Sequence, residues 1–125
     1  MELNDLTYKI RGAIFAVHNT LGPGLLESVY EAVMIYELRQ LGLHVQSQVG
    51  IPVNYNDVVL EIGFRADIIV ENTVILEIKS IEVLHDVHKK QLLTYLKLSG
   101  MKPGILINFN VTSLVDKESL IRIIN

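Results

Sequence analysis

The chain has 125 residues, a net charge of −3 and a pI of about 5.7, and half of its residues are apolar. This length predicts a single domain, residues 1–125, that can bury a core of its own. The lack of cysteine excludes disulfides, thiolate metal sites and cysteine nucleophiles, and it suits a reducing cytoplasm. No apolar stretch approaches the ~20 residues of a membrane span, and acids precede the first apolar run. We therefore expect a soluble, cytoplasmic protein with no membrane partner.

The elements can be predicted in chain order. Residues 4–20 predict a helix, and a second helix is expected over 24–41, after the break at Gly22-Pro23-Gly24 and before Gly42. Strands are expected at 45–53, 58–62, 64–70 and 74–80, a helix at 85–99, and strands at 105–109 and 119–124. This order indicates an α/β (α+β) fold, with helices packed against one central mixed sheet.

The segment 64–80 carries the strongest chemical pattern. Glu71-Asn72-Thr73 forms a three-residue turn, so the segment predicts a hairpin in which Asp67 lies opposite Glu77 and Arg65 opposite Lys79. Two carboxylates this close repel each other unless a cation lies between them, and Mg²⁺ prefers hard oxygen ligands. The alternative is a solvated hairpin face with two cross-strand ion pairs. A register slip of one residue would separate Asp67 from Glu77.

The helix at 24–41 offers two further carboxylates. Glu27 and Glu31 open a stripe that continues through Met34, Leu38 and Leu41, so we expect Glu27 to face inward. Its position in the first helical turn equally suits a role in balancing the helix dipole.

The helix at 85–99 places Gln91 and Tyr95 one turn apart on an apolar face. Polar groups on such a face need partners, which a site or a mutual hydrogen bond would supply. We expect the lysines of this helix to be solvated. His18 and His44 are expected to be satisfied or surface histidines, and His85 with His88 form only a weak candidate for chelating a transition metal.

Taken together, these residues resemble the GxxExxY family of the PD-(D/E)xK nuclease-like superfamily. The motif stands as GLLESVY at 24–30, and FRAD ending at Asp67, LEIK at 76–79, HKKQLLTYLKLSG at 88–100 and GILINF at 104–109 are similar too. The resemblance implies an αβββαβ core with a metal ion on Asp67, Glu77 and the carbonyl of Ile78. It also implies a helix-borne acid at Glu27 and a QxxxY element at Gln91 and Tyr95.

The leading hypothesis is a Mg²⁺- or Mn²⁺-dependent nuclease that hydrolyses DNA or RNA. Asp67 and Glu77 would hold the ion, Glu27 would tune it or hold a second one, and Lys79 would assist catalysis. The alternative is a non-catalytic module that binds nucleic acid or protein, which the acidic charge favours because nucleic-acid binders usually carry a basic surplus. A third hypothesis is a toxin–antitoxin or defence component whose partner protein supplies substrate binding. A homo-oligomer is compatible with each of these.

Overall fold

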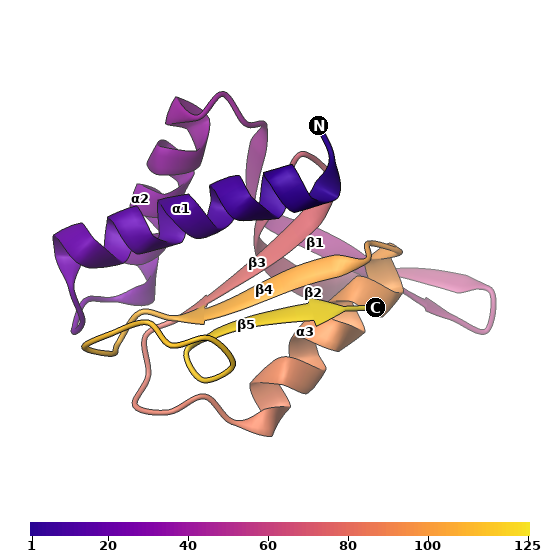
Figure 1. Cartoon of the computed structure of the whole chain (residues 1–125). Coiled ribbons are helices and arrows are strands. Elements are labelled where there is room, and N and C mark those ends of the chain that lie inside the picture. The colour runs from indigo at the N-terminus through magenta and orange to yellow at the C-terminus, as the bar shows by residue number, and fades with distance from the viewer.

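The computed structural model describes residues 1–125, apart from the side chain of Ile62. The described chain forms, in order, α1 (Leu3–Leu21), α2 (Glu27–Gln40), β1 (Val45–Tyr55), β2 (Val58–Val70), β3 (Val74–Lys79), α3 (Asp86–Ser99), β4 (Pro103–Asn108) and β5 (Leu120–Ile124) (Figure 1). The predicted fold class is confirmed. Two details differ, because 58–70 is one continuous strand and α2 begins at Glu27 rather than at residue 24. Gly24 has a φ of 95°, which is outside the helical range.

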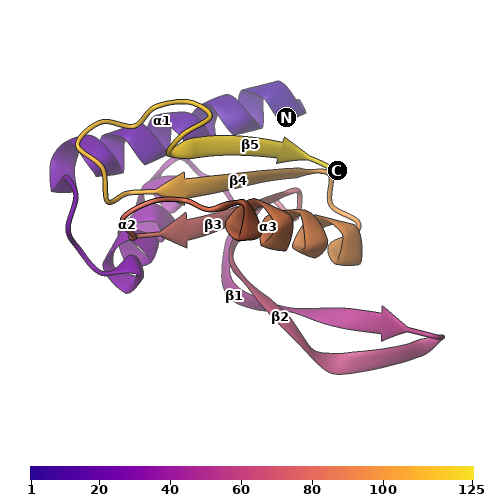
Figure 2. The same cartoon turned by 90° about the horizontal axis from the view of Figure 1, so that it is seen from below.

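One five-stranded sheet, with the strand order β1-β2-β3-β4-β5, organises the molecule. β3 and β4 are parallel and are joined by α3, whereas the other neighbours are antiparallel. Figures 1 and 2 show α1 and α2 on one face of the sheet and α3 on the other. β4 is buried along its whole length, as a strand covered on both faces should be.

Two apolar clusters fill the space between these layers. Ile10, Ile14, Met34 and Leu38 pack against one face of the sheet with Leu76 and Ile78 of β3. Ile75 packs on the opposite face with Leu92, Tyr95 and Leu96 of α3. Neighbouring residues of β3 thus enter different cores, which is the strand alternation expected from the sequence.

The hairpin of β2 and β3 has the predicted register. Ile68, Ile69 and Val70 pair with Leu76, Ile75 and Val74 around the turn at 71–73, where Glu71 and Asn72 have positive φ. The pairing ends at Ile68 and Leu76, one residue before Asp67 and Glu77.

The hairpin of β1 and β2 extends well beyond the other strands, as Figure 2 shows. Asn56 and Asp57, both with positive φ, form its tip, and the register shifts between Ile51 and Val53. A side chain at Gly63 would place its Cβ 1.9 Å from the carbonyl oxygen of Ile51, so this bulge requires glycine. Among the described residues, no helix is long and apolar enough to cross a membrane.

Candidate functional site

At Asp67 and Glu77, side-chain oxygens replace the backbone hydrogen bonds that would continue the β2–β3 pairing. The N–H of Asp67 donates to Glu77 Oε2 over 2.8 Å, and the N–H of Ile78 donates to Asp67 Oδ2, also over 2.8 Å. The carboxylates therefore lie side by side where the two strands part. Each of them has one oxygen fixed by the backbone of the other strand.

Burial makes the negative charge of this pair costly. Glu77 is only 4% exposed. Desolvation, followed by the neighbouring charge of Asp67, raises the pKa of Glu77 from its ordinary 4.5 to about 8. Desolvation also raises the pKa of Asp67, although the N–H of Ile78 and the charge of Lys79 oppose the shift. A cation at this point would offset the desolvation and the repulsion together.

Lys79 follows Glu77 on the same face of β3, since Ile78 between them belongs to the core under α1 and α2. Its charge lowers the pKa of both carboxyl groups. The prediction that Arg65 lies opposite Lys79 is wrong. The β2–β3 pairing stops before these residues, and Arg65 pairs instead with Gly50 of β1 and donates to the carbonyl of Gln48.

Glu27 is the first residue of α2, and its Oε2 accepts the N–H of Ser80 over 3.1 Å. Ser80 Oγ in turn donates to the carbonyl of Leu25, so the start of α2 is fastened to the end of β3. The predicted inward stripe is correct for Met34 and Leu38, which are fully buried. It is wrong for Leu41, which is exposed, and Glu27 is exposed as well. The helix thus presents Glu27 at the rim of the carboxylate pair.

Gln48 is a component of this region that the sequence did not reveal. It lies across from Asp67 between the paired residues Ser47–Ile68 and Val49–Ala66, and it has a φ of 51°. Its Nε2 donates to both carboxylate oxygens of Glu31 over 3.0 Å. Burial raises the pKa of Glu31, and the charges of Asp67 and Glu27 add to the shift. Spacing of i, i+4 on α2 had identified Glu31, but nothing in the sequence identified Gln48.

The two α3 residues of the predicted QxxxY element differ in their surroundings. Tyr95 is buried and its ring lies 5.1 Å from that of Phe64. Desolvation, followed by the charges of Glu77 and Asp67, raises its pKa. Gln91 is half-buried one turn earlier. A mutual hydrogen bond between Gln91 and Tyr95, the alternative to a site role, does not occur among the described residues.

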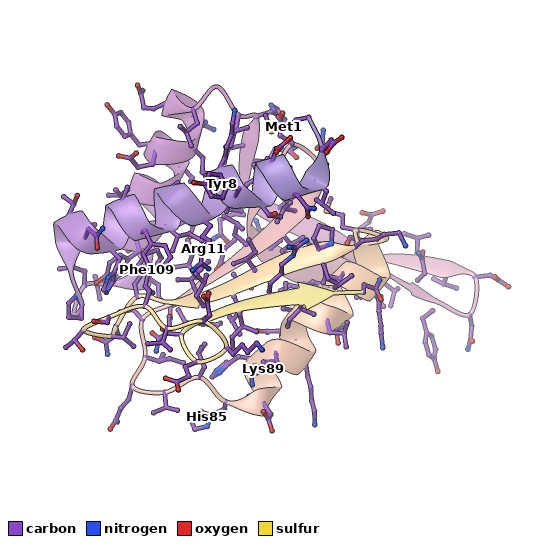
Figure 3. The ribbon with its side chains drawn as sticks, in the orientation of Figure 1. Met1, Tyr8, Arg11, His85, Lys89 and Phe109 are labelled. Carbon is purple, nitrogen blue, oxygen red and sulfur yellow. The ribbon has the colours of Figure 1, made fainter. Side chains whose placement is uncertain are left out.

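Burial, followed by the charge of Lys79, lowers the pKa of His88, which lies in the first turn of α3. Its Nδ1 accepts the N–H of His85 over 2.9 Å and thereby caps α3, whose start is marked by His85 in Figure 3. That nitrogen is engaged in capping, which argues against chelation by the two histidines. His18 is satisfied, as expected, by the carbonyl of Val111, and His44 is exposed.

Tyr30 of the GxxExxY segment has a structural position. It is fully buried, and its ring stacks on that of Phe109 with the centroids 4.5 Å apart. Phe109 is labelled below α1 in Figure 3. Its hydroxyl donates to the carbonyl of Gly22 and accepts the N–H of Leu25. Tyr30 therefore fixes the loop from which Glu27 emerges. Asn108 likewise bonds both backbone groups of Ile81 and fixes the segment after Lys79.

The chemistry of the donors fits a hard divalent cation. Asp67 and Glu77 present adjacent carboxylates, one of them almost fully buried and both with raised pKa, and the carbonyl of Ile78 lies between Glu77 and Lys79. Within the described residues, no three His, Asp or Glu side chains converge to hold an ion by themselves. A carbonyl and water would have to complete the coordination, which is how Mg²⁺ is usually bound.

The comparison with protein families agrees with this geometry. The family model of the PD-(D/E)XK nuclease superfamily matches residues 4–123, nearly the whole chain. No curated protein and no solved structure matches significantly.

Proposed function

Because the chain belongs to the PD-(D/E)XK nuclease superfamily, we propose that it is a divalent-metal-dependent nuclease that hydrolyses phosphodiester bonds of DNA or RNA. The observation that carries this proposal is the pair of half-buried Asp67 and buried Glu77, with Lys79 on the same face. Negative charge on two adjacent acids that are withdrawn from water is costly, and a cation between them removes much of that cost.

In this proposal Asp67, Glu77 and the carbonyl of Ile78 hold Mg²⁺ or Mn²⁺. The ion, when bound, supplies Lewis acidity toward the phosphate and the attacking water. The ammonium group of Lys79 orients the water or stabilises the negative charge that develops on the phosphate. Glu27, at the rim, tunes the ion or helps to hold a second one.

The two α3 residues have supporting roles in the same proposal. Tyr95 closes the apolar side of the carboxylate pair with Phe64 and keeps bulk water from Glu77. Gln91, one turn away, contacts the substrate. The finer assignments, the GxxExxY family and a cytoplasmic location, rest on the motif at 24–30 and on the absence of cysteine.

A non-catalytic binding module is the second candidate function. The observation that favours it is the charge of the chain, −3, which leaves no general surplus of cations for phosphates. Intact Asp67, Glu77 and Lys79 favour catalysis. The two acids also serve the fold, but no ion pair among the described residues gives Lys79 a structural role.

The test is a cleavage assay with single- and double-stranded DNA and RNA, each with Mg²⁺, Mn²⁺ or EDTA. We expect cleavage with the metals only, and its loss in Lys79→Ala. Lys97→Ala is the matched control, since Lys97 is an exposed lysine in the last turn of α3. Binding of nucleic acid without cleavage of any substrate would support the module instead.

A further inference from the structure

Gln48 of β1 has a backbone conformation that residues in a strand rarely adopt. Its φ is 51°, in the left-handed region that favours glycine and, to a lesser degree, asparagine. Among the described residues of β1 and β2, Gln48 alone has a positive φ. Backbone strain of this kind persists only where the surrounding structure holds it, and it is concentrated at functional sites.

The strands β1 and β2 change faces at this position. Val45 packs in the core on the α1–α2 face of the sheet, whereas Ile51, an even number of residues further on, packs in the core on the α3 face. Regular alternation would place both residues on one face. β2 changes in the same way, since Ile68 belongs to the first core and Ala66 to the second.

The change of face turns the side chain of Asp67 along the sheet. Alternation from Ile68 would direct this side chain toward the α3 face, and alternation from Ala66 would direct it toward the α1–α2 face. The carboxylate instead accepts the N–H of Ile78 on β3 over 2.8 Å. Gln48 lies across from Asp67, so the irregular residue of β1 faces the point at which β2 turns (Figure 2).

Contacts from two other elements hold Gln48 in this conformation. Its Nε2 donates to both carboxylate oxygens of Glu31 on α2, each over 3.0 Å. Arg65 of β2 donates to the carbonyl of Gln48 over 3.2 Å. Desolvation raises the pKa of Asp67, and hydrogen bonding from Gln48 is among the smaller effects that lower it. The strained residue is therefore fixed from α2 and β2 beside the candidate metal ligand.

We propose that Gln48 is a positioning residue for Asp67. The left-handed backbone of Gln48 turns the Asp67 carboxylate toward β3, and Glu31 anchors the Gln48 side chain from α2. This role rests on the proposed metal site, because it gives Asp67 the orientation in which that acid and Glu77 share an ion. Replacing a residue that orients a metal ligand typically weakens metal binding by about tenfold or more.

Glycine and alanine at position 48 test the backbone in the absence of metal. Both remove the side-chain amide, but only glycine adopts a φ of 51° without strain. Gln48→Gly should therefore melt at a higher temperature than Gln48→Ala in EDTA. Gln46, an exposed residue of the same strand without a positive φ, is the matched control. There the order should be reversed, because glycine in a regular strand is less stable than alanine.

Hydrogen exchange at the N–H of Ile78 reports the orientation of Asp67 directly, because this N–H donates to the Asp67 carboxylate. In EDTA the amide should lose protection in Gln48→Ala and keep it in Gln48→Gly. The amides of β4 provide the reference, since a general loss of stability would affect them as well.

Calorimetry with Mn²⁺ tests the consequence for the metal site. Gln48→Ala should weaken Mn²⁺ binding by about tenfold or more, and Gln48→Gly should weaken it less. Gln48→Asn keeps an amide and tolerates a positive φ, so it should bind at least as well as Gln48→Gly. Gln46→Ala and Gln46→Gly should bind like the wild type.

Three results would overturn the role of Gln48. They are the same stability order at positions 46 and 48, unchanged protection of the Ile78 amide in Gln48→Ala, and Mn²⁺ binding by Gln48→Ala that equals that of the wild type. Each of these leaves the metal site itself intact. A wild type that binds no Mn²⁺ would contradict the metal site, and the positioning role with it.

Discussion

Asp67 and Glu77 hold each other through the backbone, since each carboxylate accepts an N–H from the strand that carries the other. The two strands separate at this point, and side-chain oxygens take over the hydrogen bonds that the ladder would have made. The acids are consequently part of the sheet as well as candidate ligands. The predictions below separate these two roles.

The stability of the metal-free protein should fall as the pH rises from about 5 to about 8. Glu77 has a folded-state pKa of about 8 against an ordinary 4.5, so in this window the folded protein binds more protons than the unfolded chain. The contribution is therefore fully present below the ordinary pKa and is lost as the pH rises through the folded one. The raised pKa of Asp67 acts in the same direction.

Urea denaturation in EDTA at several pH values measures how the free energy of unfolding depends on pH. Glu77→Gln should weaken this dependence, because the amide does not titrate. A wild-type protein equally stable across the range would contradict the raised pKa.

Divalent ions should raise the melting temperature of the wild type. An ion that binds only the folded state adds about 2.7 kcal/mol when it is present at about a hundred times its dissociation constant. Glu77→Gln should lose most of this gain, whereas Glu118→Gln, at an exposed residue, should keep it. Calorimetry that detects no Mn²⁺ binding at millimolar concentrations would argue against a metal site.

Glu27→Gln distinguishes a site role from a structural role. The amide oxygen can still accept the Ser80 N–H, so the free energy of unfolding should change by no more than about 1 kcal/mol. Cleavage should nevertheless fall by orders of magnitude if Glu27 serves the ion. Glu37→Gln on the same helix is the control. Normal cleavage by Glu27→Gln would show that Glu27 only connects α2 to the end of β3 and has no role in catalysis.

Tyr30→Phe should lower the free energy of unfolding by about 1–3 kcal/mol, because the N–H of Leu25 and the carbonyl of Gly22 both lose their partner. The stacking on Phe109 remains, so the core should stay packed. Thermal denaturation measures the loss. Tyr36→Phe, at an exposed tyrosine of the same helix, should cost almost nothing, and an equal cost would show that the hydroxyl bonds are not responsible.

The neighbourhood of Asp67 and Glu77 could be predicted because it depends on local features. A three-residue turn sets the pairing of the strands beside it, and alternation then decides which face each side chain takes. Helix periodicity found Met34 and Leu38 in the same way. Patterns of this kind are contained in a few consecutive residues.

The other parts of the site depend on irregular backbone. A two-residue turn at Asn56-Asp57 would by itself place Gln46 opposite Asp67, and the bulge after Ile51 moves Gln48 there instead. Apart from Gly63, no residue in the sequence indicates that a bulge occurs there. The position of Arg65 was missed because the strands part earlier than a regular ladder would. Tyr30 was missed as a core residue because its partner, Phe109, is far away in the sequence.

The double use of Asp67 and Glu77 affects how relatives of this chain should be judged. A descendant that lost catalysis would still need both acids to close the gap between β2 and β3, so selection for folding alone would preserve them. Lys79 is different, since none of the ion pairs among the described residues includes it. A homologue that retains the two acids but has lost the lysine would therefore keep the fold and lose catalysis. The lysine is the better marker of an active enzyme.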